Sequence, residues 1–320
     1  MLKSIKSKYI RRLGLFVVLV MAVAFPLTHS NLYVTYVATL CCAWALLAES
    51  WDILTGYAGQ VSFGQAGFFA VGAYASAILS MQLGMSAWVG LFLGGAISMI
   101  VGTAVAMPCL RLERHYLALV TLGFSEIVRI ILVNWTEVTR GPMGFWGYPT
   151  FEGVPLPITY ATRVYLYYIA LAILLLSTFI MWWTGERTSI GLRFKAIREN
   201  ATLSATMGIN TTMYRTLSFA MSAFFAGLAG SLYAHNVLLV SPPIAGVDIT
   251  SIIIAMAVIG GIGTIAGPIL GAVVVVFVQE LMRLTLGVVF NLIAVGAVLI
   301  VFTIVFPQGL MGLIKKRSRT

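Results

Sequence analysis

Runs of mostly apolar residues, each about as long as a helix that crosses a bilayer, fill most of this 320-residue chain. Two of these runs, Ala87–Met107 and Val164–Thr184, contain no charged residue. Over the whole chain 60% of the residues are apolar and only 9% are charged, which excludes an ordinary soluble domain. The sequence therefore predicts an all-α, polytopic integral membrane protein.

The distribution of basic residues predicts how the chain is oriented in the membrane. The net charge is +10, but the lysines and arginines lie in short gaps between apolar runs rather than on one soluble face, which argues against a nucleic acid as partner. Most of them fall in gaps on one predicted side, which the positive-inside rule assigns to the cytoplasm. Both termini, residues 1–12 and 307–320, are basic and are predicted to be cytoplasmic.

Between the termini, residues 13–306 are expected to form one membrane domain of about ten transmembrane helices in contact with the lipid bilayer. Residues 136–163 contain four prolines and four glycines, a composition typical of an ordered external loop. The predicted spans are residues 13–27, 32–54, 55–84, 87–107, 116–135, 164–184, 216–235, 249–262, 264–282 and 284–306.

Two glycine-rich stretches, Gly56–Gly72 and Gly260–Gly271, interrupt predicted spans, one in each half of the chain. Paired interruptions of this kind indicate a duplicated transporter architecture with its site between the halves. For the first stretch two interpretations stay open. Its small residues allow close packing of helices, whereas its polar side chains also suit a broken segment that lines a transport path.

Charged side chains inside an apolar run add further candidates. Glu126 and Arg129 lie about one helical turn apart in the middle of a predicted span. Ionisable groups at this depth usually face protein or water, so the pair either neutralises itself for structural reasons or serves the substrate directly. The candidates for the transport path are Gln60, Ser62, Gln65, Glu126, Arg129, Gly263 and Gly267, the last two sharing with Gly271 one face of a predicted helix.

The longest polar interval on the cytoplasmic side covers residues 185–215 and is basic. Within it, Asn200 suits the N-cap of a short helix from Ala201 to Met207, and Gly208 can end that helix in the left-handed conformation. The sequence therefore predicts a short helix that lies outside the bilayer and faces the cytosol.

No motif predicts an enzyme, a cofactor or a metal centre. The dipeptide Gly-Lys does not occur, so the chain has no Walker-type loop to bind the phosphates of ATP. The three histidines are isolated, and the three cysteines have no metal-ligand spacing. We therefore expect a conduit that has no motor of its own.

Three motifs in a fixed order resemble the permease subunits of branched-chain amino acid ABC (ATP-binding-cassette) importers, of the LivM type. They are GYAGQVSFGQAGFFAVGAYASA, then RFKAIRENATLSATMGIN followed by SFAMSAFFAGLAGSLYAH, then GGIGTIAGPILGA. The resemblance runs from about Leu32 to Gly312. Two sites depart from it: residues 201–205 lack the acidic residue and paired alanines that are frequent in relatives, and Gln65 stands where histidine is common.

The resemblance implies a non-enzymatic transport subunit of the bacterial inner membrane that moves branched-chain or related amino acids. It implies as partners a second homologous permease subunit, two ATP-binding subunits and an extracytoplasmic solute-binding protein. In that family a cytoplasmic coupling helix docks into a groove of the ATP-binding subunit. The residues that the resemblance assigns to this coupling, within Arg198–Ile209, are Arg198, Glu199, Asn200, Ala201, Leu203, Ser204, Met207, Gly208 and Ile209.

The alternative is an ion-coupled secondary carrier for a small polar solute, in which Glu126, Asp248 or Glu280 would titrate or bind the ion. That alternative explains the embedded charges, but it gives no role to the basic segment 185–215. A purely structural membrane protein would leave the paired glycine breaks unexplained.

Overall fold

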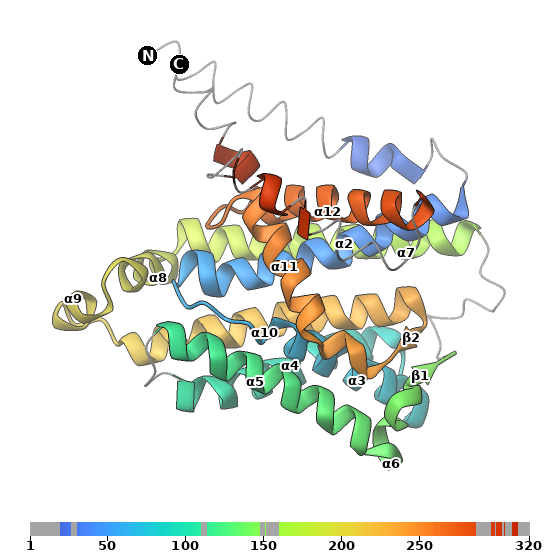
Figure 1. Cartoon of the computed structure of the whole chain (residues 1–320), viewed down its shortest axis with the longest axis horizontal. Helices are drawn as coiled ribbons and strands as arrows, with labels where there is room; N and C mark the ends of the chain where they lie inside the picture. Colours follow the sequence, from blue (N-terminus) through green and yellow to red (C-terminus); the bar gives the residue numbers. More distant parts are fainter. Residues whose placement is uncertain are drawn as a thin grey trace, which may run out of the picture.

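The computed structural model describes residues 20–26, 31–109, 114–147, 151 and 160–285, and short stretches at 296–297, 299–302, 304 and 309–312. Within these ranges the chain is a bundle of long helices that lie side by side (Figure 1). The longer helices are α2 (Leu32–Asp52), α3 (Gln65–Gln82), α4 (Ala87–Cys109), α5 (Arg114–Asn134), α7 (Tyr160–Trp182), α8 (Ser189–Glu199), α10 (Thr211–Val237), α11 (Val247–Gly260) and α12 (Ala266–Thr285). The shorter elements are α6 (Thr136–Thr139), α9 (Ala201–Thr206), the π-helices η1 (Ile53–Tyr57) and η3 (Trp183–Arg187), the 3-10 helices η2 (Gly141–Met143) and η4 (Pro242–Ala245), and the strands β1 (Phe145–Trp146) and β2 (Leu239–Val240).

Six helical segments among the described residues are long and apolar enough to cross a membrane, which confirms the all-α, polytopic class. They correspond to six of the predicted spans and cover residues 32–57, 87–109, 116–134, 160–187, 211–237 and 266–285. Two more predicted spans, 55–84 and 249–262, correspond to α3 and to the shorter apolar helix α11. The predicted spans 13–27 and 284–306, and both predicted cytoplasmic tails, lie wholly or largely outside the described residues.

Helices α3, α4 and α10 approach one another at backbone distance because small residues lie where they cross. A Cβ atom added to Gly72 in α3 would lie 2.3 Å from the carbonyl oxygen of Gly227 in α10. A Cβ atom added to Gly94 in α4 would lie 2.7 Å from the carbonyl oxygen of Gly72. The Ser231 hydroxyl of α10 also donates to the Gly72 carbonyl over 3.1 Å. The close-packing interpretation of the first glycine-rich stretch is thus confirmed at Gly72.

The backbone between α2 and α3 is broken, so residues 55–84 do not form one continuous helix. After the π-helix η1, residues 58–64 are not helical, and α3 begins only at Gln65. Backbone polar groups at membrane depth need partners inside the protein. Here the Phe63 N–H donates to the Thr121 hydroxyl of α5 over 2.9 Å. The stretch therefore has a broken backbone first and close helix packing after it, while a role of the break in lining a transport path stays a prediction.

The second glycine-rich stretch forms the turn between α11 and α12. Gly261 (φ +118°) and Gly263 (φ +74°) adopt backbone conformations that residues with a side chain rarely take. Gly267 and Gly271 lie on the side of α12 that packs on α11, as predicted. The prediction was wrong for Gly263, which precedes α12 because a positive φ cannot continue a right-handed helix.

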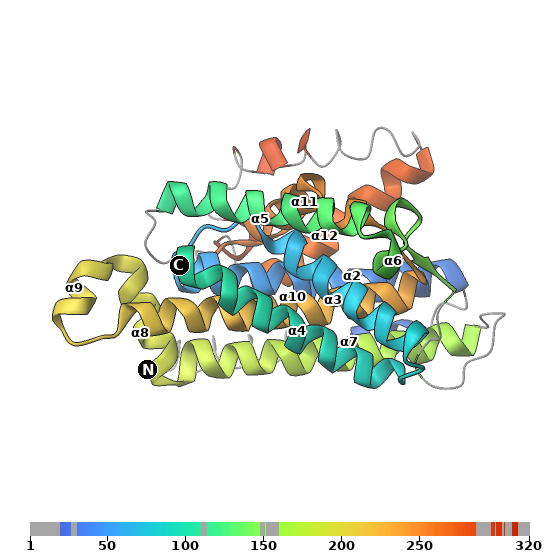
Figure 2. The same ribbon diagram turned by 90° about the horizontal axis from the view of Figure 1, so that it is seen from below.

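The two ends of the bundle carry different elements (Figures 1 and 2). Helices α8 and α9 extend past the membrane helices at one end, and α6, β1 and β2 lie at the other end. At that second end β1 pairs antiparallel with β2, with Phe145 opposite Val240. Strand β1 belongs to the predicted external loop 136–163, which in the structure ends a little earlier, where α7 begins at Tyr160. The predicted cytoplasmic segment and the predicted external loop thus occupy opposite ends.

Candidate coupling junction

A helix that the sequence did not predict, α8, precedes the predicted short helix of residues 185–215. Its buried residues, Gly191, Phe194 and Ile197, recur at every third position. Gly191 lies directly against the backbone, because a Cβ atom added there would be 2.1 Å from the Gly185 carbonyl oxygen. This three-residue spacing is the signal that could have predicted α8, although basic side chains at the intervening positions obscure it.

The predicted short helix is present as α9 and ends one residue earlier than expected. The Asn200 side chain accepts a hydrogen bond from the Leu203 N–H over 3.0 Å, as an N-cap does. Gly208 follows the helix with φ +83°, as expected. Leu203 is 61% exposed and Met207 is 79% exposed, so α9 presents apolar side chains to its surroundings.

The inner side of α9 and the residues after it are fixed to the rest of the chain. The Ser204 hydroxyl is buried and donates to the Asn200 carbonyl over 2.8 Å. Ala201 and Ile209 pack against a small apolar cluster made of Ala58, Phe194, Ile197 and Tyr214. The two ends of the segment therefore pack on the rest of the chain, while most of α9 between them is exposed.

Arg198 reaches from the end of α8 to the first break. Arg198 and Glu199 form the last turn of α8, so the implied coupling segment contains parts of two helices rather than one. The Nη1 of Arg198 donates to the Gly56 carbonyl oxygen over 2.6 Å. Gly59 (φ +70°) leaves room for this side chain, because a Cβ atom there would lie 2.6 Å from the Arg198 Cγ. Arg198 thus connects α8 to the broken backbone after α2.

The second break reaches the same point through Asp52. This residue ends α2 and is only 2% exposed, and its Oδ1 accepts a hydrogen bond from the Gly263 N–H over 2.7 Å. A Cβ atom on Gly56 would lie 2.6 Å from the Gly263 nitrogen, and one on Gly263 would lie 3.2 Å from the Arg198 Nη1. We name these four residues, Asp52, Gly56, Arg198 and Gly263, the coupling junction. Both glycine breaks and the segment 185–215 meet there.

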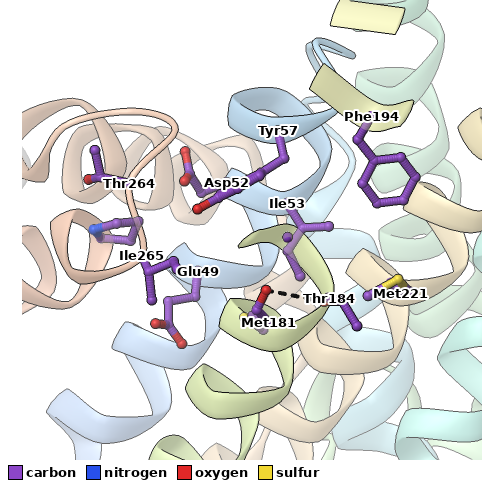
Figure 3. A pocket seen from close by; sticks show the side chains of 12 residues that line it. Glu49, Asp52, Ile53, Tyr57, Met181, Thr184, Phe194, Met221, Thr264 and Ile265 are labelled. Carbon is purple, nitrogen blue, oxygen red and sulfur yellow. Dashed lines mark hydrogen bonds between the residues drawn. The ribbon is translucent and has the colours of Figure 1, made fainter. Parts of the chain in front are cut away.

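A small cavity lies beside the coupling junction (Figure 3). Its volume is about 20 Å³, which is room for one water molecule. Glu49 and Asp52 line it from successive turns of α2, and Thr264 and Ile265 line it from the second break. Its full lining is Glu49, Asp52, Ile53, Tyr57, Met181, Thr184, Gly185, Phe194, Met221, Thr264, Ile265 and Pro268.

Neither acidic residue was predicted as part of a site, although two carboxylates one turn apart in an apolar run were a usable signal. Glu49 is 3% exposed and accepts a hydrogen bond from the Thr178 hydroxyl of α7 over 2.9 Å. The Asp52 Oδ2 is buried without a hydrogen-bond partner in the described chain. The cavity therefore places a polar group beside the contact between the two breaks.

The polar path candidates of the first break connect helices within the chain. The Gln65 amide donates to the hydroxyls of Ser50 in α2 (2.6 Å) and Ser222 in α10 (3.1 Å). The Gln60 amide donates to the Ser218 hydroxyl of α10 over 2.8 Å. All three candidates of this break are buried: Gln60, Ser62 and Gln65. Their place in a transport path stays a prediction.

Glu126 and Arg129 lie apart from the junction, on the outward side of α5. The Arg129 Nε donates to the Glu126 Oε2 over 2.9 Å, so the two charges neutralise each other. Their side chains are 37% and 40% exposed, respectively. The structure shows that Glu126 and Arg129 pair with each other, while a direct interaction of this pair with a substrate stays a prediction. Across the described ranges, no three His, Cys, Asp or Glu residues form a group that could hold a metal ion.

Residues 33–304 match the family described as branched-chain amino acid transport system / permease component. The high-affinity branched-chain amino acid transport system permease proteins LivM of Salmonella typhimurium (strain LT2) and of Escherichia coli (strain K12) are each 33% identical to this chain, over 94% of it and 75% of the relative. The permease protein LivH of the same system in Salmonella typhimurium is 26% identical, over 86% of this chain and 92% of the relative. No solved structure matches. Since the family match covers every helix of the coupling junction, the chain belongs to the branched-chain amino acid transport system permease family.

Proposed function

We propose that this chain is the membrane-spanning permease subunit of an ATP-driven importer that moves branched-chain or related amino acids across the bacterial inner membrane. Its family and its six apolar helices make it a multi-pass inner-membrane protein. The observation that carries the proposal is the coupling junction, where Arg198 of the segment 185–215 binds the first break and the first break packs on the second. An ion-coupled carrier needs no such contact, so the junction favours the importer.

Helix α9 suits a docking role toward an ATP-binding subunit. Leu203 and Met207 are both largely exposed, although most large apolar side chains of a folded protein are buried. The left-handed Gly208 turns the chain back toward α10, so that α9 stands at the tip of the projecting segment (Figure 1). The proposal places the ATP-binding subunit on this tip, with the apolar side chains in its groove.

Movement of α9 can reach the membrane through α8. Asn200 is at once the C-cap of α8 and the N-cap of α9, so no flexible linker separates the two helices. Arg198 at the end of α8 then holds Gly56, and Gly56 packs on Gly263. A rigid-body displacement of the docked helix would therefore shift both breaks together. Because both breaks would shift, the polar residues of the first break and the glycines of the second remain candidates for the transport path.

The assembly in this proposal follows from what the chain lacks and from its relatives. Without a Walker-type loop, ATP hydrolysis falls to two partner subunits. The chain is similar both to LivM and to LivH, which are named as permease proteins of one transport system, and this supports a second, homologous permease as partner. An extracytoplasmic solute-binding protein would deliver the amino acid at the end that carries α6, β1 and β2 (Figure 1).

The test uses the complex isolated from its native membrane and reconstituted in liposomes with its binding protein. We expect ATPase subunits to co-purify, and uptake of a branched-chain amino acid to require ATP. The double variant Leu203→Glu, Met207→Glu should lose most of the co-purified ATPase, because charges would replace the apolar contacts. The control Lys195→Ala alters an exposed ion pair on α8 and should keep the ATPase bound.

Uptake that continues without ATP and follows a proton or sodium gradient would instead establish the secondary carrier. Full retention of the ATPase by the double variant would show that α9 is not the docking element. These two results separate the identity of the transporter from the place of its coupling contact.

A further inference from the structure

Helix α5 is the least buried of the six candidate spans. In its apolar stretch of 18 residues, 28% of the residues are buried, whereas the corresponding shares in the other five spans are 33% to 72%. It lies at the lower edge of the bundle in Figure 1. Its outward side exposes Leu119, Ile127 and Ile130, and the Glu126–Arg129 ion pair lies between them. This side of α5 is therefore not covered by the rest of the described chain.

The exposed sides of two other membrane helices provide a comparison. Helix α4 has no charged residue and exposes Phe92 and Ile100 near its middle. Helix α7 exposes Leu176 and Phe179 in its C-terminal half. These surfaces are apolar, as hydrocarbon requires. The outward side of α5 differs from them in carrying two charged groups at mid-span.

An ion pair exposed to hydrocarbon is unstable because both charges lose their hydration while gaining one partner. Glu126 and Arg129 are bonded to each other, and in the described chain neither has a further hydrogen bond. The Glu126 carboxylate can still accept further hydrogen bonds, and the Arg129 guanidinium can still donate further ones. The pair is therefore built to be covered by protein that supplies complementary polar groups.

The same side of α5 has room for another helix. Gly123 lies one turn before Glu126, and a Cβ atom added to it would have no neighbour within 4 Å. A glycine at such an open position lets a second backbone approach closely. An ion pair is also self-complementary under two-fold symmetry, because Glu126 of one helix can meet the equivalent of Arg129 on the other.

We infer that the α5 face formed by Gly123, Glu126, Ile127 and Ile130 is the contact surface for the second permease subunit. This inference rests on the proposed function, which supplies a second permease. A subunit similar to LivH, itself 26% identical to this chain over 92% of its own length, would present a helix equivalent to α5 at this contact.

The inner side of α5 gives this contact a consequence for transport. Thr121 accepts the Phe63 N–H of the first break, and Gly67 packs directly on Phe124. The helix thus stands between the neighbouring subunit and the broken backbone. Any displacement of one permease against the other acts on the break through α5.

The experiment places a photo-activatable benzophenone amino acid at Ile127 in the complex within native membranes. Matched positions are Ile100 on α4 and Leu176 on α7, which are also exposed isoleucine or leucine residues of membrane helices. After irradiation, we expect Ile127 to give an adduct with a second permease chain, identified by mass spectrometry. The adduct from either matched position should be at least tenfold weaker.

Three results would overturn the inference, and they can be told apart. If the purified complex contains a second permease but the adduct forms from Ile100 or Leu176, or from none of the three positions, the surface assignment fails alone. If the complex contains no second permease, the inference fails together with that part of the proposed function. An adduct of Ile127 with lipid alone would show that the ion pair faces the bilayer.

Discussion

The Nη1 of Arg198 lies 2.6 Å from the Gly56 carbonyl, and its Nη2 lies 3.2 Å from a Glu199 carboxylate oxygen. A charged donor binds a carbonyl more strongly than a neutral one does, and the planar guanidinium can hold two acceptors in fixed directions. Lysine offers one compact ammonium group and cannot reproduce this geometry. At the scale of single residues, Arg198 is therefore the link between α8 and the first break.

Replacing this link should separate ATP hydrolysis from transport. A hydrogen bond to a charged group contributes about 1.5–3 kcal/mol, so Arg198→Ala is expected to lower uptake per ATP hydrolysed roughly 10-fold or more. Lys195→Ala, on the same helix but in an exposed ion pair with Glu186, should change it less than about fivefold. Uptake and ATPase are measured together in proteoliposomes. Equal loss of both activities in Arg198→Ala would mean that the residue serves assembly and not coupling.

Local sequence signals predicted some of these residues and not others. The Asn200 cap and the Gly208 turn follow from chemistry within a few positions, so both could be predicted. The hydrogen bond from Gly263 to Asp52 joins residues 211 positions apart, and no local pattern encodes such a pairing. The Glu126–Arg129 pair was visible because it lies within one helical turn.

At the scale of elements, the three helices α3, α4 and α10 pack on one another at backbone distance. Of the six candidate spans, α10 is also the most buried, since 72% of the residues in its apolar stretch of 18 are buried. Gly230 of α10 lies against α3 so closely that an added Cβ would be 2.0 Å from the Phe69 carbonyl oxygen. These contacts leave no space for even one methyl group, so the three helices are expected to move as a unit.

Adding a methyl group to this contact should destabilise the protein markedly. Gly72→Ala forces a Cβ against the Gly227 backbone, and overpacking of this kind costs about 1–3 kcal/mol or more. Gly84→Ala is the control, since Gly84 has open space and only its positive φ opposes alanine, at a cost of about 1 kcal/mol. The thermal midpoint of the purified complex should fall further for Gly72→Ala. Equal midpoints would contradict backbone-level packing at this crossing.

Periodicity and composition predicted the long helices well, and the misses have physical reasons. Apolar length identified the spans of α2, α4, α5, α7, α10 and α12 because bilayer thickness fixes that length. Helix α8 was missed because its buried stripe is narrow and three basic residues, Arg193, Lys195 and Arg198, lie between and beside its positions, which resembles a solvated loop. The start of α3 was misplaced because glycine content indicates a break without fixing where helix resumes.

At the scale of the whole molecule, the two glycine breaks lie in different halves of the sequence and meet at one point. One side of the fold is the close-packed group of α3, α4 and α10, and the coupling junction lies where α2, α8 and the α11–α12 turn converge. The cavity beside it provides room for small displacements. The layout predicts that nucleotide-driven movement is concentrated at this junction.

This concentration can be measured by thiol accessibility. With Cys41, Cys42 and Cys109 replaced by alanine, Thr264→Cys at the cavity should react with a membrane-impermeant maleimide at rates that differ at least threefold between the nucleotide-free and ATP-trapped complex. The control Ala77→Cys lies in the buried part of α3 and should stay unreactive in both states. An unchanged rate at Thr264→Cys would place the moving part of the molecule elsewhere.

The exposed tip of α9 also bears on how the cell produces this protein. In the proposed orientation, a newly made copy that has not met its partners displays Leu203 and Met207 to the cytosol, and such patches invite aggregation and capture by chaperones or proteases. By the inference drawn from α5, the same orphan copy would also hold the Glu126–Arg129 pair against lipid. Balanced synthesis of all subunits therefore protects this chain, and overproduction of it alone should shorten its lifetime in the membrane.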